Sequence, residues 1–450
     1  AIGMDERTFL RECSATFKQG VRFNHWVRAA GQPGHDHYFH PFSQPSQRPG
    51  APELLPYWLL GGAPAGLALA DAVTLQKRVA DACHGTKHAS DPSFIGALNY
   101  AYHFDAGGLA GALARHGRAL GVAHMLATVE QVRLDESGAI ESVLTREHGA
   151  LRADLYVDCT GFRAALIGQA LGSPLRRLDR VLFVDRALAM QVPYARPDAP
   201  IASYTVATAH EAGWTWDIGL HERRGIGYVY SSAHTDDARA EQALRRYVGP
   251  AGDALAARRL QLEVGYRDVQ WVGNCVAVGL SAGFLEPLES SGGGLIEAAT
   301  YLIGCLFPFD GDFEPAARHF NAHMRTRFER IVDFLKMHYC LSRRTEPFWI
   351  DNAAASSIPD SLRELLTKWR ARPPHRLDFV TDLEMYPPSS WQYVLYGMEY
   401  ATDAAALRAA HPHTEAARRE FATLQEVARR ALADLPPHRL LIEQMLARAD

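Results

Sequence analysis

The chain has 450 residues, of which 47% are hydrophobic and 22% charged, and its formal net charge is -4. A chain of this length and apolar content can bury a large core. It has no basic block, which argues against a nucleic-acid or anionic-membrane partner, and no apolar run reaches the roughly 18 residues of a bilayer span. Small molecules are therefore the expected ligands.

The six cysteines are scattered without Cys-x-x-Cys spacing, each in an apolar or strand-like context. Such a pattern is typical of reduced thiols in a cytoplasmic enzyme, so we expect no disulfide. The sequence opens "AIGMDERTFLREC" with a helical pattern and without a signal-peptide pattern, and we expect it to begin inside a domain.

Periodicity gives a first division of the chain. Residues 17–23 predict a strand with Phe17, Val21 and Phe23 on one face and Lys18 on the other. A long loop rich in proline, glycine and histidine follows, and its length makes it a candidate for function. The expected helices are 71–83, 106–117, 317–339, 360–370 and 414–435, and strands are expected between 124 and 162. An α/β fold with a helical final third follows from this order.

The stretch "FLEPLESSGGGLIEAA", residues 284–299, places acids and glycines against an apolar helix. A helix N-terminus exposes unpaired N–H groups, and glycines let an anion approach the backbone. Residues 290–293 are thus a candidate seat for an anion or a cofactor. A plain strand-to-helix junction with serine caps explains the pattern as well, and Glu286 and Glu289 are then loop acids favoured near a helix start.

Two further segments allow two interpretations each. In "LYVDCTGF" the small residues Thr160 and Gly161 follow an apolar strand, which suits close approach of a nucleotide cofactor or an ordinary strand end. In "GWTWDIG" the tryptophans Trp214 and Trp216 share one strand face. They can wall an aromatic pocket, although such pairs are more often core residues.

The segment "HDHYFHPF" carries three histidines, His35, His37 and His40, beside Asp36. Their spacing matches none of the common zinc signatures, so we expect no metal here. Aromatic and histidine side chains on a long loop suit recognition of a flat ring better. Lys18, taken alone, is most simply a solvated lysine.

Six segments in order give a stronger indication: "RECSATFKQGVRF", "DHYFHPF", "YHFDAGGLA", "LYVDCTGF", "WTWDI" and "GLSAGFLEPLESSGG". Together they resemble the flavin-dependent halogenases of the tryptophan-halogenase type, over nearly the whole chain. The resemblance implies an α/β fold with a flavin-monooxygenase-like FAD-binding module. Residues 1–310 would form the flavin- and halide-binding module with its substrate-lining loop, and residues 311–450 a helical region packed on it.

The resemblance also implies roles for individual residues. The catalytic pair would be Lys18 and Glu289, and the halide would lie on the backbone of Ser291 and Gly292. The residues implied to bind FAD are Thr160, Gly161, Gly279, Gly283 and Gly293. The residues implied to line the substrate pocket are His40, Phe42, Trp214 and Trp216, joined through a looser match by Tyr393, Tyr396 and Glu399.

In such an enzyme a separate flavin reductase supplies FADH2, which with oxygen converts chloride or bromide to hypohalous acid. Lys18 would then hold the electrophilic halogen, by a hydrogen bond or as an N-halo amine, beside one ring carbon. Glu289 would stabilise the cationic ring intermediate and take its proton. The resemblance implies an indole, tryptophan-like or phenolic substrate, and we also expect a homodimer.

Some features differ from the family pattern. The family begins with a glycine-rich turn for the FAD pyrophosphate, and no Gly-x-Gly-x-x-Gly occurs near the start of this sequence. Gly293 replaces a bulky aliphatic residue, and Gly219 replaces a proline. Two alternatives stay open: a flavin-dependent aromatic monooxygenase, which needs no Lys18–Glu289 pair, and a non-catalytic relative that binds an aromatic ligand.

Overall fold

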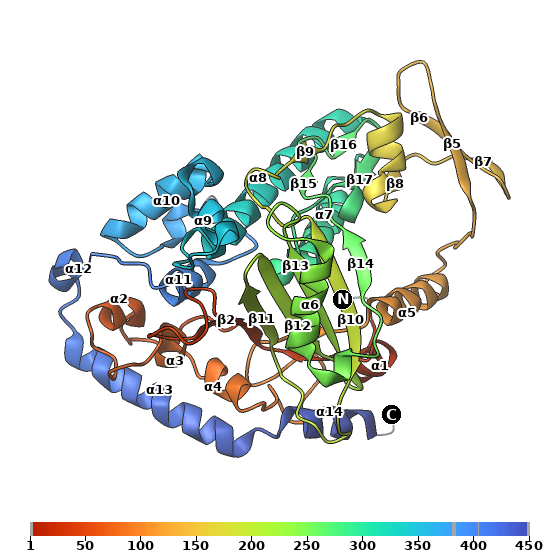
Figure 1. Ribbon diagram of the computed structural model, residues 1–450. Coiled ribbons are helices and arrows are strands. Elements are labelled where there is room, and N and C mark those ends of the chain that lie inside the picture. Colours follow the sequence, from red (N-terminus) through yellow and green to blue (C-terminus); the bar gives the residue numbers. More distant parts are fainter. Residues whose placement is uncertain (1–2, 380–383, 404, 448–450) are drawn as a thin grey trace.

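The structure, a computed structural model, describes residues 3–379, 384–403 and 405–447. Its largest sheet has seven strands and lies at the centre of the molecule, with helices around it (Figure 1). In spatial order the strands are β14 (Arg258–Gln261), β10 (Arg186–Pro193), β13 (Arg223–Tyr230), β12 (Gly213–Gly219), β11 (Thr205–His210), β2 (Gly20–Asn24) and β3 (His37–Pro41). Neighbouring strands run antiparallel except for β11 and β2, which are parallel.

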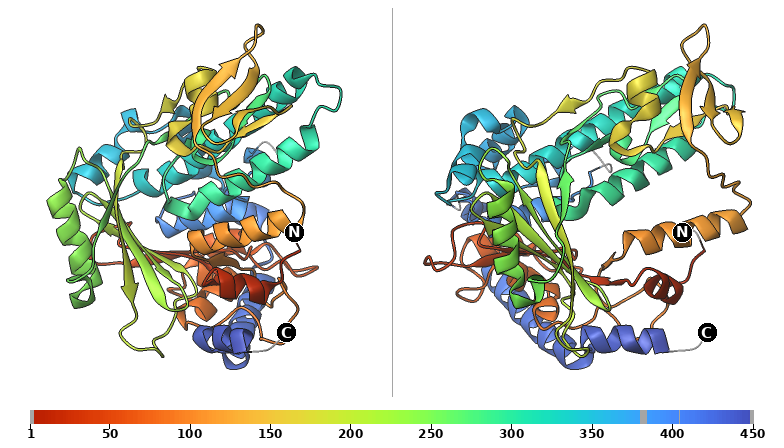
Figure 2. Two further views of the ribbon diagram at one scale, coloured as in Figure 1. Left: turned by 90° about the vertical axis from the view of Figure 1, so that its right-hand side faces the viewer. Right: turned by 45° about the vertical axis from the view of Figure 1, so that its right-hand side comes forward.

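The smaller sheets have two or three strands each. They are β1 (Thr16–Lys18) with β4 (Ala101–His103); β16 (Trp271–Val272), β17 (Cys275–Ala277) and β8 (Tyr156–Asp158); β18 (Gly283–Phe284), β15 (Gly265–Tyr266) and β9 (Arg176–Arg177); and β5 (Val129–Leu134), β6 (Ile140–Thr145) and β7 (Gly149–Leu151). The last of these projects from the body of the molecule (Figure 2). Strands β8 and β17 are parallel, so their carboxyl ends share one edge.

Helices occupy much of the rest of the described chain. They are α1 (Glu6–Glu12), α2 (Leu54–Leu59), α3 (Leu69–Val73), α4 (Gln76–Asp81), α5 (Ala106–Ala119), α6 (Asp237–Val248), α7 (Ser291–Leu306), α8 (Phe313–Cys340), α9 (Pro347–Ala353), α10 (Asp360–Ala371), α11 (Pro388–Gly397), α12 (Ala405–Ala410), α13 (Thr414–Asp434) and α14 (His438–Ala447). The mixed α/β fold and the helical final third are confirmed. The helix expected over 71–83 is instead split into α3 and α4.

The main core joins the early strands to the C-terminal helices. Phe23 and Trp26 belong to the same buried cluster as Phe334, Tyr339 and Trp391. The ring centroids of Trp26 and Tyr339 lie 5.2 Å apart. Residues on the two sides of position 310 thus share one core, and the division there stays a prediction.

The strand expected over 17–23 is interrupted at Gln19. The N–H of Gln19 donates to the carbonyl of Ser203 at 2.7 Å, and β1 and β2 belong to different sheets. Phe17 therefore packs in another apolar cluster than Phe23. Lys18 is buried, with 5% of its surface exposed, so its interpretation as a solvated lysine is wrong.

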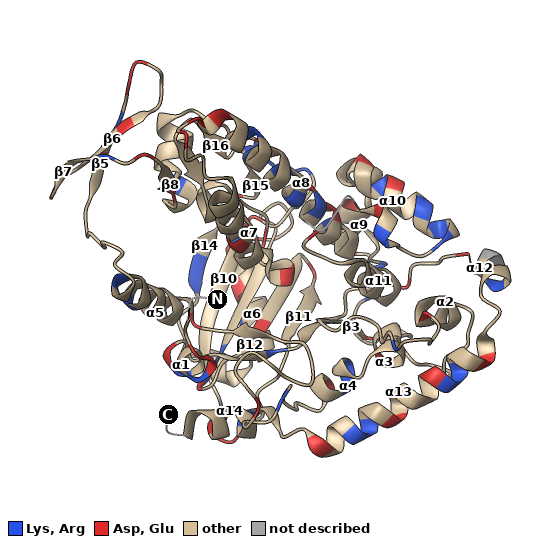
Figure 3. Cartoon of the chain, turned by 180° about the vertical axis from the view of Figure 1, so that it is seen from behind, with Lys and Arg blue, Asp and Glu red and all other residues tan. Residues whose placement is uncertain are grey.

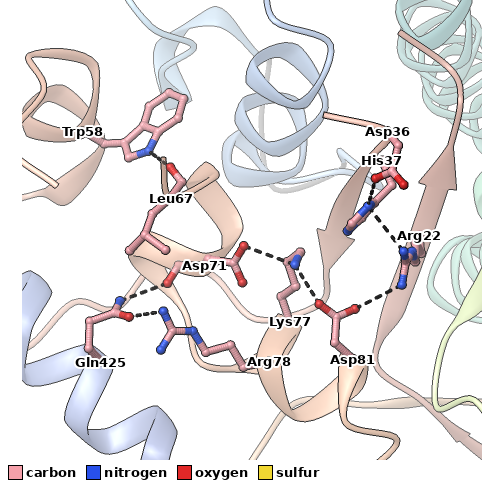
Figure 4. A network of polar contacts seen from close by, with 10 residues as sticks. All are labelled: Arg22, Asp36, His37, Trp58, Leu67, Asp71, Lys77, Arg78, Asp81 and Gln425. Atoms are coloured by element: carbon pink, nitrogen blue, oxygen red, sulfur yellow. Dashed lines mark hydrogen bonds and ion pairs between the residues drawn. The ribbon is translucent and has the colours of Figure 1, made fainter. Parts of the chain in front are cut away.

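A polar network fixes α3 and α4 against β2 on the side shown in Figure 4. Lys77 pairs with Asp71 at 3.1 Å and with Asp81 at 2.7 Å, and Asp81 lies 3.7 Å from Arg22. Because these groups are partly buried, salt screens the attraction between their charges only weakly. The network anchors β2 and its neighbour β3.

The surface carries charges of both signs. Basic and acidic residues alternate along α13 (Figure 3). In this helix Arg418 pairs with Glu415, and Arg430 pairs with Glu426. Within the described ranges, no helix is long and apolar enough to cross a bilayer. All six cysteines are free.

Candidate active site

Lys18, the last residue of β1, reaches the turn before α7. Its Nζ lies 3.2 Å from Ser290 Oγ and 5.5 Å from the centroid of the Phe42 ring. Burial lowers the pKa of this amine to about 8, and the negative charge of Glu289 opposes that shift. The amine can therefore act as a donor or, when it loses its proton, as a nucleophile near neutral pH.

The turn that presents Glu289 and Ser290 has an unusual backbone. Both residues lie in the left-handed region, with φ of 60° and 58°. Residues other than glycine seldom adopt this conformation, which costs about 1–3 kcal/mol each. The strained turn places the carboxylate of Glu289 beside His40 while the hydroxyl of Ser290 meets Lys18.

Glu289 is buried, yet it is held as a carboxylate. Its Oε1 lies 2.8 Å from His40 Nδ1 and 3.5 Å from His338 Nε2. Burial acts to raise the pKa of Glu289, but His40, His338 and Lys18 lower it, and the pKa ends below its ordinary value. An anion in this position can stabilise a nearby cation and accept its proton.

Three residues near Glu289 were missed by the sequence interpretation. His40 Nε2 lies 2.8 Å from Ser390 Oγ, and His338 Nδ1 lies 2.6 Å from the hydroxyl of Tyr38. Tyr38 could have been found, because it precedes His40 by two residues on β3 and so shares its face. His338 and Ser390 come from α8 and α11, and no local pattern relates them to the turn.

Glu286 lies on the same segment but in other surroundings. Its Oε2 accepts a hydrogen bond from the phenol of Tyr339 at 2.8 Å, and burial raises its pKa to about 8. It is therefore a neutral acid near pH 7. Of the two acids, it is Glu289 that lies beside His40 and His338.

The first turn of α7 offers free backbone N–H groups. No side chain caps this helix. A Cβ built on Gly292 or Gly293 meets no atom within 4 Å, so the space beside these residues is open. Ser291 and Gly292 line a cavity of about 70 Å³ that also touches Gly279. Such an N-terminus suits an anion, and the open glycines suit a flat cofactor.

The residues expected to bind FAD lie near this cavity and at one sheet edge. Thr160 and Gly161 follow β8, and Gly279 follows the adjacent parallel strand β17. Ligands in open sheets bind outside the carboxyl ends of parallel strands. Thr160 also has a structural role, since its hydroxyl donates to Asp158 at 2.7 Å. A Cβ at Gly283 would lie 2.6 Å from that of Tyr266, so close strand pairing already requires this glycine.

Of the paired tryptophans, Trp214 lies in the core and Trp216 is partly buried against it. Trp214 is 2% exposed, and its ring centroid lies 6.0 Å from that of Trp26. Trp216 packs so closely over Gly227 that a Cβ there would overlap its ring. Neither indole makes a recorded hydrogen bond or ring contact with Lys18 or Glu289. A role in the substrate pocket stays a prediction for both.

The expected C-terminal substrate residues separate in the structure. The ring of Tyr393 lies 6.4 Å from that of His40, so this residue adjoins the site. Glu399 is bound to Arg28 through two hydrogen bonds of 2.7 and 2.6 Å, and to Arg343 at 3.0 Å. Its carboxylate is thus committed to arginines.

The histidine-rich segment divides in a similar way. His40 joins the site, whereas His37 contacts Asp36 at 2.5 Å and Arg22 at 3.3 Å in the network of Figure 4. Among the described residues, no group of three or more histidine, cysteine and acidic side chains could hold a metal ion.

Comparison with known proteins agrees with this geometry. Residues 1–413 match the sequence profile of the tryptophan halogenase family. The chain is 34% identical to the tryptophan 6-halogenase SttH of Streptomyces toxytricini, over 97% of this chain and 86% of that protein. It is 33% identical to the tryptophan 7-halogenase RebH of Lentzea aerocolonigenes, over 98% and 88%.

Solved structures show the same relationship. The tryptophan halogenase of Shewanella frigidimarina superposes with a TM-score of 0.93 and 37% identity, covering 99% of this chain and 85% of that one. The resemblance read from the six sequence segments is thereby confirmed. The chain belongs to the tryptophan halogenase family and is a flavin-dependent halogenase.

Proposed function

We propose that this halogenase places chloride or bromide on an indole- or phenol-type ring held between Lys18 and Glu289. One observation carries the proposal. The turn before α7 brings together an amine with a lowered pKa, a buried carboxylate and an open helix N-terminus. The elements that meet there, β1, β3 and α7, are far apart in the sequence. Neither a hydroxylase nor a ligand-binding protein needs this combination, and family membership does not favour those alternatives.

The described residues fit a flavin nucleotide. Gly292 and Gly293 leave open space at the start of α7, and Thr160, Gly161 and Gly279 lie at the carboxyl ends of parallel strands. When bound, reduced FAD with oxygen would oxidise the halide to hypohalous acid. The backbone N–H groups of Ser291 and Gly292 would hold the halide before that step.

Lys18 would position the electrophilic halogen. Its ammonium can donate a hydrogen bond to hypohalous acid, and its neutral amine can form an N-halo amine with release of water. The hydrogen bond to Ser290 and the position over Phe42 restrict where Nζ can lie. Fixing the halogen beside one ring carbon supplies selectivity and proximity together.

Glu289 would complete the substitution. Attack of the ring on the halogen leaves a cationic ring whose attacked carbon carries both hydrogen and halogen. The carboxylate stabilises this cation and then accepts the proton, so that the C–H electron pair restores the aromatic ring. His40 and His338 favour the anionic form that this role needs.

The substrate class is argued from the surroundings and from relatives. His40, Phe42 and Tyr393 lie around the catalytic pair and suit a flat aromatic ring. The relatives SttH and RebH are named as tryptophan halogenases, so an indole ring is the first candidate. The carboxylate of Glu399 is occupied by Arg28 and Arg343, so it does not favour binding of a substrate amine by this residue. The substrate is therefore argued from its ring, which we propose to be tryptophan-like.

A separate flavin reductase would supply FADH2. A homodimer and a cytoplasmic location stay predictions, as do the roles of Trp214 and Trp216.

The test is mass spectrometry of indole and tryptophan incubated with the protein, FAD, a flavin reductase, NADH, oxygen and chloride or bromide. We expect products with the halogen isotope pattern, and their loss in Lys18→Ala. Oxygenated product that persists in Lys18→Ala would instead identify a monooxygenase. A wild-type protein that binds flavin and an indole but forms no product would contradict the proposal.

A further inference from the structure

Two histidines contact one oxygen of Glu289, and each has a second partner on its other ring nitrogen. His40 turns Nδ1 to Glu289 and Nε2 to the hydroxyl of Ser390, both at 2.8 Å. His338 turns Nε2 to the same carboxylate oxygen at 3.5 Å and Nδ1 to the phenol of Tyr38 at 2.6 Å. The two rings therefore present opposite nitrogens to Glu289.

The chemistry of Glu289 fixes the hydrogens on this chain of contacts. A carboxylate only accepts hydrogen bonds, so a hydrogen on each facing ring nitrogen is the favourable arrangement. Nδ1 of His40 lies within hydrogen-bond distance of Glu289, whereas Nε2 of His338, at 3.5 Å, faces the carboxylate without a hydrogen bond and has no other partner among the described residues. Burial lowers the pKa of His338 to about 3, so this ring is neutral and carries a single N–H. Its Nδ1 must then accept, and burial keeps the phenol of Tyr38 protonated as the donor by raising its pKa.

The same reasoning applies to His40. Its Nδ1 faces the carboxylate and carries the hydrogen, so when the ring holds a single hydrogen its Nε2 accepts. The hydroxyl of Ser390 can rotate and donate to Nε2. With one hydrogen on each ring, the two histidines have opposite tautomers, each set by a hydroxyl from a different element, α11 for Ser390 and β3 for Tyr38.

We propose that Ser390 and Tyr38 are positioning residues that act through His40 and His338: each hydroxyl fixes one tautomer, so that both rings direct an N–H to Glu289 and hold it as an oriented anion. The catalytic consequence rests on the proposed function, because it concerns the proton that Glu289 takes from the ring. The tautomers are a property of the resting protein and can be measured without catalysis.

Removing these hydroxyls leaves the surrounding packing in place. The ring of Tyr38 stacks on Phe23 with centroids 4.6 Å apart, so Tyr38→Phe keeps this contact and loses only the donor. Ser390→Ala removes one hydroxyl from α11, and Ser390→Thr keeps it. Ser389→Ala, on the same helix, and Tyr204→Phe, whose ring packs on Phe39, are the matched controls.

The first measurement is nitrogen NMR of the protein with labelled histidine rings, in which His40→Asn and His338→Asn assign the signals. We expect the proton on Nδ1 of His40 and on Nε2 of His338. Ser390→Ala should disturb the tautomer of His40 alone, and Tyr38→Phe that of His338 alone. A hydrogen on Nε2 only of His40, or unchanged tautomers in both variants, would overturn the proposal.

The second measurement is the pKa of the Glu289 carboxyl, followed by carbon NMR and assigned with Glu289→Gln. The titratable groups that face it are Lys18 from β1, His40 from β3, His338 from α8, and Tyr386, whose hydroxyl lies 3.5 Å from the Glu289 carbonyl. Poorly directed N–H groups stabilise the anion less. We therefore expect both variants to raise this pKa, and neither control to change it.

Measurements of enzyme activity then distinguish a positioning role of Ser390 and Tyr38 from a role in packing alone. In Ser390→Ala and Tyr38→Phe we expect kcat to fall roughly threefold to tenfold with KM unchanged, the scale of one hydrogen bond. The acid limb of the pH profile should move to higher pH, and Ser390→Thr should restore it. A lower rate without any change in the pKa of Glu289 would identify a structural role and overturn the proposal.

The two proposals fail in different ways. If the tautomers and the carboxyl respond as expected but no halogenated product forms, the proposed function is wrong and the positioning stands. If the protein halogenates an indole while neither variant changes the pKa of Glu289, the function stands and the positioning is wrong.

Discussion

Glu286 and Glu289 lie on one segment before α7, and each side chain is 2% exposed, yet their protonation differs. Burial raises the pKa of Glu286 to about 8, whereas the pKa of Glu289 is lowered. Glu286 meets a phenol, Tyr339, and Glu289 meets His40 and His338. Burial alone makes an acid neutral, and only directed N–H groups and positive charge reverse that outcome.

The lysines near these acids show a parallel contrast. Lys336, near Glu286, donates to the carbonyl of Val181 at 2.9 Å and to Asn352 Oδ1 at 2.8 Å. Lys18, near Glu289, has a single recorded hydrogen bond, to Ser290. The amine of Lys336 is thus used in hydrogen bonds that hold the fold together, whereas the amine of Lys18 remains available for chemistry.

The largest expected difference is in catalysis. Glu289→Gln should lower kcat for halogenation by about 10²- to 10⁴-fold, the range for loss of a general base. Glu286→Gln replaces a neutral acid by a neutral amide and should change kcat by less than about threefold. Steady-state product formation measures both, with circular dichroism as the folding control. Equal losses in the two variants would remove the distinction between the two acids.

The next difference is in stability. Lys336→Met leaves the carbonyl of Val181 and the Oδ1 of Asn352 without their donor, and should lower the free energy of unfolding by about 3 kcal/mol. Lys18→Met relieves a desolvated amine and should change it by less than about 1 kcal/mol. Urea denaturation measures both. The double variant Lys336→Met, Asn352→Leu should lose less than the sum of its single variants, and additivity would contradict this coupling.

The two acids should also respond oppositely to pH. The folded pKa of Glu286 is raised to about 8 from an ordinary 4.5, so between these values the folded state holds a proton that the unfolded chain has released. Its contribution to stability therefore falls as pH rises, by up to about 1.4 kcal/mol per unit. Glu286→Gln should therefore gain stability relative to wild type as the pH rises from 5 to 7. This range lies below the pKa of Lys336, which burial lowers to about 7.

Glu289 has the opposite sign. Its folded pKa is lowered, so its contribution is present above the ordinary value and is lost as pH falls through the folded pKa. The stability that Glu289→Gln loses relative to wild type should therefore be smallest at acidic pH. Denaturation of Glu286→Gln between pH 5 and 7, and of Glu289→Gln from pH 5 downward, tests this. Slopes of the same sign in the two windows would show that the two environments do not differ.

The smallest expected effect concerns the strained turn. Glycine adopts the φ of 58° at Ser290 freely, so Ser290→Gly should stabilise the fold by about 0.5–1 kcal/mol. The same change removes the partner of Lys18 and should lower kcat a few-fold. Ser14→Gly, at a left-handed residue with φ of 47° outside the site, should stabilise without a change in kcat. An unchanged kcat in Ser290→Gly would show that the strain has no function.

Several features of the site could be read from the sequence because they are local. The segment "LESSGGGLI" predicts a helix start with glycines, which α7 confirms, and the alternation around Lys18 predicts strand structure, although not its break at Gln19. The amphipathic repeat from Phe320 to Leu335 fixes α8, and the helical final third follows from similar patterns. Ordered segments shared with one family then identified the enzyme class.

Other features depend on contacts between distant residues. The sequence places Lys18 beside polar residues on a strand, and only the break at Gln19 with the turn before α7 buries it against Ser290. Nothing local relates His338 or Ser390 to Glu289. The protonation of the two acids is likewise absent from the sequence, because a pKa depends on burial and on the groups that face the carboxyl.

The sequence by itself therefore determined the family, the helical final third and the candidates for the reacting groups, since these follow from ordered motifs, local periodicity and side-chain chemistry. The tertiary structure alone decided which acid is held as an anion, which lysine lies beside it and which histidine ring nitrogens face Glu289. Those properties arise from desolvation and hydrogen bonds between residues that only the folded chain brings within about 3 Å of one another.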